Sequence, residues 1–164
     1  MVRGAEFNPE KIFAGVEVNP QLGAQVKELA TWMENGIEMA RVAVRIRPEQ
    51  AIRTHLHTCN DEEMIAHTRI ILALGDAKKN EAGEYVTLDN KDGEPEVLAD
   101  NWQFFVLYPG DRMPIIEGKT HYIANTEKEY GYAEFALPRA HFDVNTLGGV
   151  DRKWVVSPSV PSNL

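Results

Sequence analysis

The segment with the most reactive side chains is RTHLHTCNDEEMIAH, residues 53–67, which holds three histidines, a cysteine, an aspartate and two glutamates. Successive side chains of a β-strand point to opposite faces, so His55 and His57 would share one face. Neutral imidazole nitrogens bind zinc, iron, nickel and copper, and Glu62 or Glu63 could add a carboxylate oxygen. The segment therefore indicates one half of a metal site, with a surface location of the histidines as the competing interpretation.

A second segment, GDRMPIIEGKTHYIAN (110–125), supplies a histidine from a distant part of the chain. Turn signals at Pro109-Gly110 and at Gly118 bracket a short strand and place His121 at the start of the next strand. A ligand held on a strand is positioned more rigidly than one on a loop. His121 is therefore the candidate that completes the site.

Taken in order, the two segments resemble the two conserved motifs of the cupin superfamily. His55, His57 and Glu62 follow the pattern His-x-His-x4-Glu, and Gly110, Gly118, His121 and Asn125 follow the spacing of the second motif. The resemblance spans residues 40–137 and implies a small antiparallel barrel that holds one divalent ion (iron, nickel, manganese or zinc). The metal ligands that it implies are His55, His57, Glu62 and His121.

The chain departs from the cupin motifs at three positions. Ile116 stands where the second motif usually has proline, and Glu49 and Arg69 stand where the first motif has glycine. The turn that carries Glu62 could hold an insertion, so Glu63 or His67 could be the ligand instead. A site of three histidines without a carboxylate is a further alternative.

One N-terminal helix is expected over residues 19–36. Asn19 is a suitable N-cap, Pro20 suits the first helical position, and Gly36 suits the position after the last turn. Apolar residues recur on one helical face, at Leu22, Val26, Leu29 and Met33.

From residue 40 the period changes to two, as in ARVAVRIR (40–47), which is typical of a half-buried strand. Seven more short strand-like segments follow, separated by turn signals such as DNKDGEP (89–95). Residues 138–151 read as a long loop. We therefore expect an all-β chain: a single cupin-like antiparallel β-barrel (a double-stranded β-helix or jelly roll) over residues 38–156, with a loose tail at 157–164.

Composition narrows the class of protein. The 164 residues, 43% of them hydrophobic, fit one domain over 1–164. A net charge of −8 argues against nucleic acid as a partner, and no apolar run is long enough for a membrane span. The single cysteine, Cys59, cannot form an intramolecular disulfide and suits a reducing compartment, so we expect a cytoplasmic protein. A lone cysteine is usually inert, and Cys59 is left outside the site.

These observations predict an enzyme that acts on a small molecule at one metal ion. The resemblance to cupins favours a non-haem-metal dioxygenase, because the ligand set leaves positions open for substrate and oxygen. A metal-dependent sugar isomerase, epimerase or lyase is the alternative, with Glu63 or His67 moving the proton. A non-catalytic cupin that binds a small ligand is a third. The helix and the first strand could form a homodimer contact.

Overall fold

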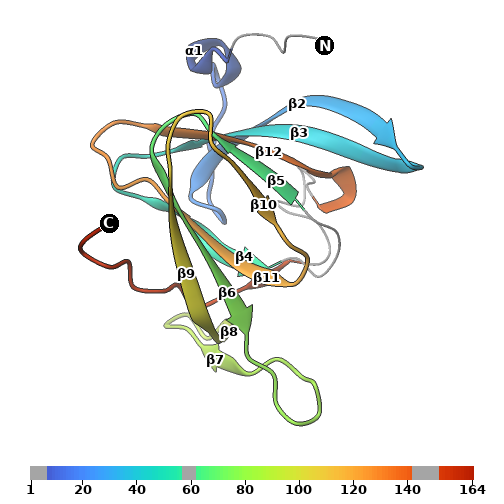
Figure 1. Cartoon of the computed structure of the whole chain (residues 1–164), viewed down its shortest axis with the longest axis vertical. Helices are drawn as coiled ribbons and strands as arrows, with labels where there is room; N and C mark the ends of the chain where they lie inside the picture. Colours follow the sequence, from blue (N-terminus) through green and yellow to red (C-terminus); the bar gives the residue numbers. More distant parts are fainter. Residues whose placement is uncertain (1–6, 57–61, 142–151) are drawn as a thin grey trace.

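The computed structural model describes residues 7–56, 62–141 and 152–164, and its regular structure there is almost entirely β-strand (Figure 1). Two antiparallel sheets face each other, as the all-β prediction requires. The helical elements are a single turn, α1 (Pro9–Ile12), and a 3-10 turn, η1 (Arg139–His141). In the described part of the chain, no helix has the length and apolar character needed to cross a membrane.

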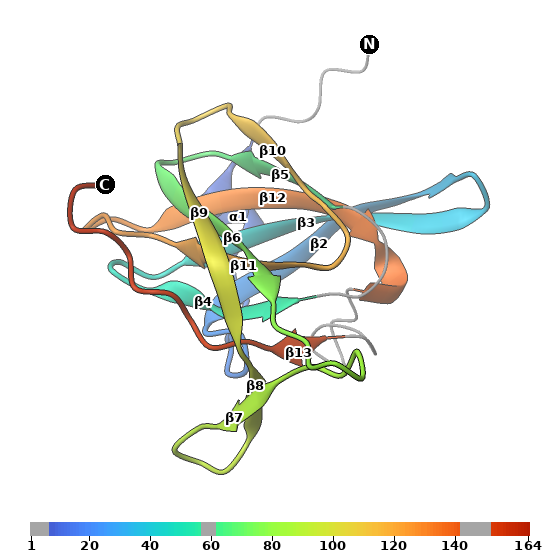
Figure 2. The ribbon, with the colours of Figure 1, turned by 60° about the horizontal axis from the view of Figure 1, so that its bottom comes forward.

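The two sheets contain six and five strands, and a separate hairpin extends from one of them. In spatial order, the six-stranded sheet contains β1 (Val18–Asn19), β2 (Ala24–Glu34), β3 (Ile37–Ile46), β12 (Gly131–Pro138), β5 (Glu62–Ala66) and β10 (Arg112–Ile115). The five-stranded sheet contains β13 (Lys153–Trp154), β4 (Ala51–Leu56), β11 (Lys119–Ala124), β6 (Ile70–Ala77) and β9 (Ala99–Leu107). The hairpin of β7 (Thr87–Asp89) and β8 (Pro95–Val97) lies between β6 and β9 in the chain and projects beyond them (Figure 2).

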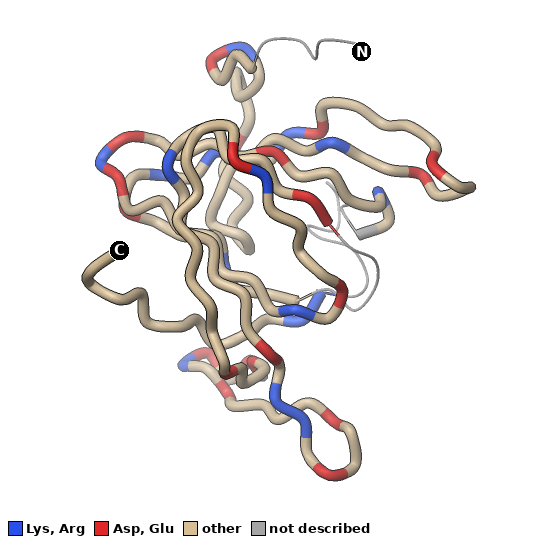
Figure 3. The backbone as a smooth tube through the Cα atoms, viewed as in Figure 1, with Lys and Arg blue, Asp and Glu red and all other residues tan. Residues whose placement is uncertain are grey.

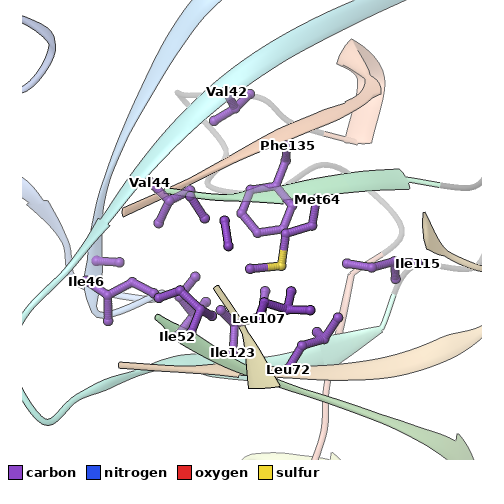
Figure 4. Packing of buried hydrophobic residues seen from close by; sticks show 14 of the residues in the cluster. Val42, Val44, Ile46, Ile52, Met64, Leu72, Leu107, Ile115, Ile123 and Phe135 are labelled. Carbon is purple, nitrogen blue, oxygen red and sulfur yellow. The ribbon is translucent and has the colours of Figure 1, made fainter. Parts of the chain in front are cut away.

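The space between the sheets is filled by the side chains that alternate inward along each strand. On β12, Phe135 and Leu137 point inward, and Met64 does the same on β5. They meet Leu72 and Ile123 of the other sheet (Figure 4). Burying one such side chain contributes about 1.5–3 kcal/mol, so this shared core holds the two sheets together.

Residues 24–34, expected to be helical, form a strand, so the prediction of a helix over 19–36 is wrong. β2 pairs along its length with β3 and has Gly36 in the turn between them. In Figure 1 this hairpin extends well beyond the barrel. As a result Met33 is 66% exposed, which removes the apolar helical face on which the prediction rested. The strands of the body therefore begin with β1 at Val18, earlier than the expected residue 38.

Asn19 caps a turn and not the expected helix. Its side-chain oxygen accepts hydrogen bonds from the main-chain N–H groups of Gln21 and Leu22. The N–H of Gly23 then donates to the carbonyl of Asn19, and Gly23 has a φ of +76°. A residue with positive φ ends a helical turn, so the chain leaves this turn as an extended strand.

The segment DNKDGEP forms the turn between β7 and β8, as predicted. Figure 3 shows acidic and basic positions concentrated in turns and near strand ends. Most of the expected loop over 138–151 lies outside the described residues, and residues 157–164 contain no helix or strand.

Candidate functional site

His55 and His121 are direct neighbours on two paired strands. They are register partners in the antiparallel pair of β4 and β11, and the register shifts between this pair and the next, Ile52 with Ile123. The shift adds one residue on β4, which brings both His55 and Ile52 to the same interior cavity. Leu56 lies on the opposite face, in a second apolar cluster.

The two imidazoles converge through the same ring atom. The Nε2 atoms of His55 and His121 are 2.8 Å apart, and the rings meet at an interplanar angle of 72°. Nδ1 of His55 lies 2.7 Å from the carbonyl oxygen of Arg53. Because a carbonyl oxygen only accepts, this Nδ1 carries a proton. The bond between the two Nε2 atoms needs a proton on one of them and a lone pair on the other.

Burial controls the charge of the second histidine. His121 is almost inaccessible to solvent, and desolvation lowers the pKa of its imidazole to about 4. The positive charge of Arg152 lowers this pKa further, while a hydrogen bond to the main chain of Lys119 opposes the shift. His121 is therefore neutral at pH 7, the form in which imidazole binds a metal.

Glu62 approaches the same cavity from the facing sheet. It is the first residue of β5, and it alternates inward with Met64. Burial raises the pKa of the Glu62 carboxyl to about 7, although the positive charge of Arg152 lowers it. Burial lowers the pKa of Arg152 to about 10, and Glu62 opposes that shift. The site thus couples a buried acid to a partly desolvated cation.

The cavity between these groups has a volume of about 50 Å³, enough for a few water molecules. Its polar lining, within the described ranges, consists of His55, Glu62, His121 and Arg152. The remaining wall is aliphatic or aromatic and includes Val42, Val44, Ile52, Ile123, Phe135 and Leu137. The cavity therefore has a mostly apolar wall that contains four polar side chains.

Three of the four predicted metal ligands, His55, Glu62 and His121, line this cavity. His57 lies outside the described residues. Among the residues that the structure does describe, no three His, Cys, Asp or Glu side chains are grouped closely enough to hold a metal ion.

The two predicted catalytic residues lie elsewhere. Glu63 points away from Glu62 on β5, is 49% exposed and pairs with Arg112 at 2.6 Å. His67 bonds Glu134 at 2.8 Å, and its ring stacks on Phe7. Neither residue lines the cavity, so the structure does not support them as its proton-transfer groups.

The sequence reasoning missed Arg152. It directly precedes β13, and β13 pairs with β4 so that Trp154 is the register partner of His55. The sequence does predict a strand at RKWVV (152–156). The pairing of that strand with β4 is a long-range feature that the local pattern does not contain.

No family model matches the sequence, and no curated protein matches it. Solved structures do resemble it. The capsular polysaccharide assembling protein CapF from Staphylococcus aureus has a TM-score of 0.58 at 12% identity, over 85% of this chain and 32% of that one. Oxalate decarboxylase of Lactobacillus farciminis, in a formate complex, has a TM-score of 0.51 at 13% identity, over 85% of this chain and 33% of that one.

The chain spans about a third of the length of each of these two structures. At this level of identity the likeness concerns the fold. The chain has the cupin fold, which confirms the fold class that the resemblance implied.

Proposed function

We propose that this cupin-fold chain is a metal-dependent enzyme that acts on a small organic molecule whose reacting end enters its barrel. The observation that carries the proposal is the convergence of His55 and His121, whose Nε2 atoms lie 2.8 Å apart at the wall of a buried cavity. His55 and His121 would hold one divalent ion, with Glu62 and His57 as further ligands.

The two histidine nitrogens suit such an ion. Two imidazole nitrogens that bind one ion at about 2.0–2.1 Å on adjacent corners of an octahedron are about 3 Å apart. The observed separation is close to that value. Nδ1 of His55 is held by a main-chain carbonyl, the usual outer partner of a metal-binding histidine. These features support Fe, Mn, Ni or Zn without choosing among them.

The lining of the cavity suggests a substrate that is largely apolar. A sugar buried here would need a hydrogen-bond partner for each hydroxyl group, because burying an unpaired hydroxyl is costly. The described wall offers four polar side chains, and two of them are the converging histidines. Arg152 would bind a carboxylate or carbonyl oxygen of the substrate, for which its guanidinium is well shaped.

A dioxygenase is the reaction class that this lining favours. A bound redox-active ion would supply oxygen activation, and the protein would supply the rest. Val42, Val44 and Phe135 would exclude water from the reacting groups. Arg152 would orient the substrate, and the main-chain bond from His55 would fix the position of its ring.

An isomerase or lyase is the second candidate, and one observation favours it. A buried carboxyl with a pKa of about 7 can both accept and donate a proton at neutral pH. Glu62 would then be the proton-transfer group, in the role that the sequence assigned to Glu63 or His67.

Metal content tests the proposal. The protein would be stripped with EDTA, reloaded separately with Fe²⁺, Mn²⁺, Ni²⁺ and Zn²⁺, desalted and measured by elemental analysis. We expect about one ion per chain in the wild type and in the His67→Ala control, and almost none in His121→Ala. Circular dichroism would check that each variant is folded. Wild-type protein that stays empty after reloading with every ion would overturn the proposal.

Oxygen consumption separates the two reaction classes. The loaded protein would be screened with small aromatic and aliphatic carbonyl compounds and acids, in air and under argon. Turnover that consumes oxygen and stops under argon assigns the dioxygenase. Turnover that continues under argon assigns the isomerase or lyase. Metal-loaded protein that binds these compounds without converting any of them is a ligand-binding cupin.

A further inference from the structure

A groove separate from the buried cavity lies between the β7–β8 hairpin and β13. Figure 2 shows β8 and β13 next to one another. Its volume is about 360 Å³, within the usual range of small-molecule sites. Its walls include Tyr85, Thr87, Val97, Lys153 and Trp154.

Strand pairing fixes the positions of both walls of the groove. β13 pairs with β4, and Val155 forms a β-bridge to Val97 of the hairpin. These two valines and Leu56 form the second apolar cluster of the protein, against which Tyr85 packs. The two walls are therefore fixed relative to one another by main-chain hydrogen bonds and a small core.

The groove presents aromatic rings and cations together. Nζ of Lys153 lies 5.7 Å from the centre of the Tyr85 ring, and Cζ of Arg152 lies 5.3 Å from that of Trp154. Nζ of Lys79, which is outside the groove lining, is 4.9 Å from the centre of the Tyr85 ring. Such a surface suits a ligand with a flat apolar body and a negative charge.

Glu94, the acidic side chain among the described residues that line the groove, is already paired. One nitrogen of Arg53 bonds Glu94 at 2.9 Å and Glu96 at 3.1 Å. Lys153 has no carboxylate partner among the residues that the structure describes. The charge of Lys153 is therefore available to an anionic ligand, although the chain as a whole is acidic.

Two residues connect the groove to the buried site. Arg152 lines both the groove and the cavity. Trp154 lies in the groove wall, and its ring meets that of His55 edge-on, with the ring centres 6.1 Å apart. The Trp154 ring thus connects the groove wall to His55.

We propose that the groove binds an organic carboxylate with an apolar or aromatic body, its carboxylate at Lys153 and its body against Tyr85. The link to catalysis rests on the proposed function: the bound molecule would be the outer part of an elongated substrate whose reacting end enters the cavity. The binding itself needs no metal.

A titration followed by NMR tests the groove. The probe is 4-phenylbutyrate, added to EDTA-treated protein, and the signal is the indole N–H resonance of Trp154, assigned with Trp154→Phe. We expect a saturable shift of this resonance. The uncharged analogue 4-phenyl-1-butanol should bind about tenfold more weakly, because it lacks the carboxylate.

Paired variants locate the interaction. Lys153→Met is expected to weaken binding of the probe about fivefold, and Tyr85→Leu to weaken both probe and alcohol. Lys91→Met, at the exposed tip of the same hairpin and outside the groove, should bind like the wild type. Equal binding of acid and alcohol, or equal effects of the two lysine variants, would overturn the proposal. Because the protein is free of metal, these results do not depend on the metal-content test.

Discussion

Nε2 of His55 and Nε2 of His121 lie 2.8 Å apart although the two residues are 66 positions apart in the chain. The contact results from antiparallel pairing, which makes the two residues direct partners on β4 and β11. Glu62, on the facing sheet, lines the same cavity. The site therefore depends on the closure of the barrel, and its titration behaviour follows from the burial that closure produces.

Metal affinity should depend on pH through Glu62. With a pKa of about 7 in the metal-free protein, its carboxyl is increasingly protonated below pH 7, and protons then compete with the ion. We expect the affinity for Co²⁺ to fall about tenfold per pH unit between pH 7 and pH 5. His121, with its pKa of about 4, should add competition only near the lower end. Calorimetric titration at each pH would measure this.

Glu62→Gln is the matched variant for that experiment. It should bind Co²⁺ more weakly than the wild type at pH 8 and should show little pH dependence between pH 7 and pH 5. A Gln variant with the slope of the wild type would show that Glu62 is not a ligand.

The same carboxyl should affect the stability of the metal-free protein. The folded state holds its proton up to about pH 7, whereas the reference pKa of the group is 4.5. Its contribution to stability is therefore fully present below pH 4.5 and is lost as pH rises through 7. We expect Glu62→Gln to be more stable than the wild type at pH 8, by up to about 3 kcal/mol, and the difference to shrink toward pH 4.5.

Urea denaturation in EDTA at several pH values would measure that difference. Subtracting one protein from the other cancels the contribution of His121, which acts in the opposite direction. Glu63→Gln, on the exposed face of the same strand, is the control and should show no such trend. A constant difference between wild type and Glu62→Gln would contradict the prediction.

The sequence was sufficient for features that depend on local pattern. Alternation identified β3 and most later strands, and turn residues identified the β7–β8 hairpin. His55 and His121 were identified as partners through the motif spacing that resembles cupins. Confirmation of the cupin fold bears out that resemblance at the level of architecture.

Features that depend on pairing between strands far apart in the sequence could not be predicted from local pattern. Glu62 was expected in a turn, but it begins β5 because that strand pairs with β10 and β12. Arg152 reaches the cavity through the pairing of β13 with β4. In both cases the partner strand is far away in sequence, and no local period specifies it.

Replacing a core methionine should test how the two sheets are held together. Met64 is completely buried between them, and Met64→Ala is expected to cost about 2–5 kcal/mol of unfolding free energy, from lost burial and the cavity left behind. Met33, on the projecting hairpin, is 66% exposed. Met33→Ala should change stability by less than about 0.5 kcal/mol, so comparable losses for the two variants would contradict the described packing.

The turn between β2 and β3 offers a test of the element that the sequence analysis misread. Asn35 and Gly36 have φ values of +49° and +78°, and Glu34 pairs with Ile37 across them, as in a two-residue type I′ hairpin. Asn-Gly is the strongest short hairpin signal, and here the helical spacing of Val26, Leu29 and Met33 obscured it.

A side chain at Gly36 would meet no atom within 4 Å, so any loss of stability on substitution comes from the backbone conformation alone. We expect Gly36→Ala to lower the unfolding free energy by about 1–2 kcal/mol, because alanine disfavours positive φ. Gly36→Asn should lose less, since asparagine tolerates this region. Urea midpoints of the three proteins would give the order. If residues 24–34 were instead a helix ending at Gly36, the C-cap would produce the same order, but Met33→Ala would then remove a buried contact and cost far more than 0.5 kcal/mol.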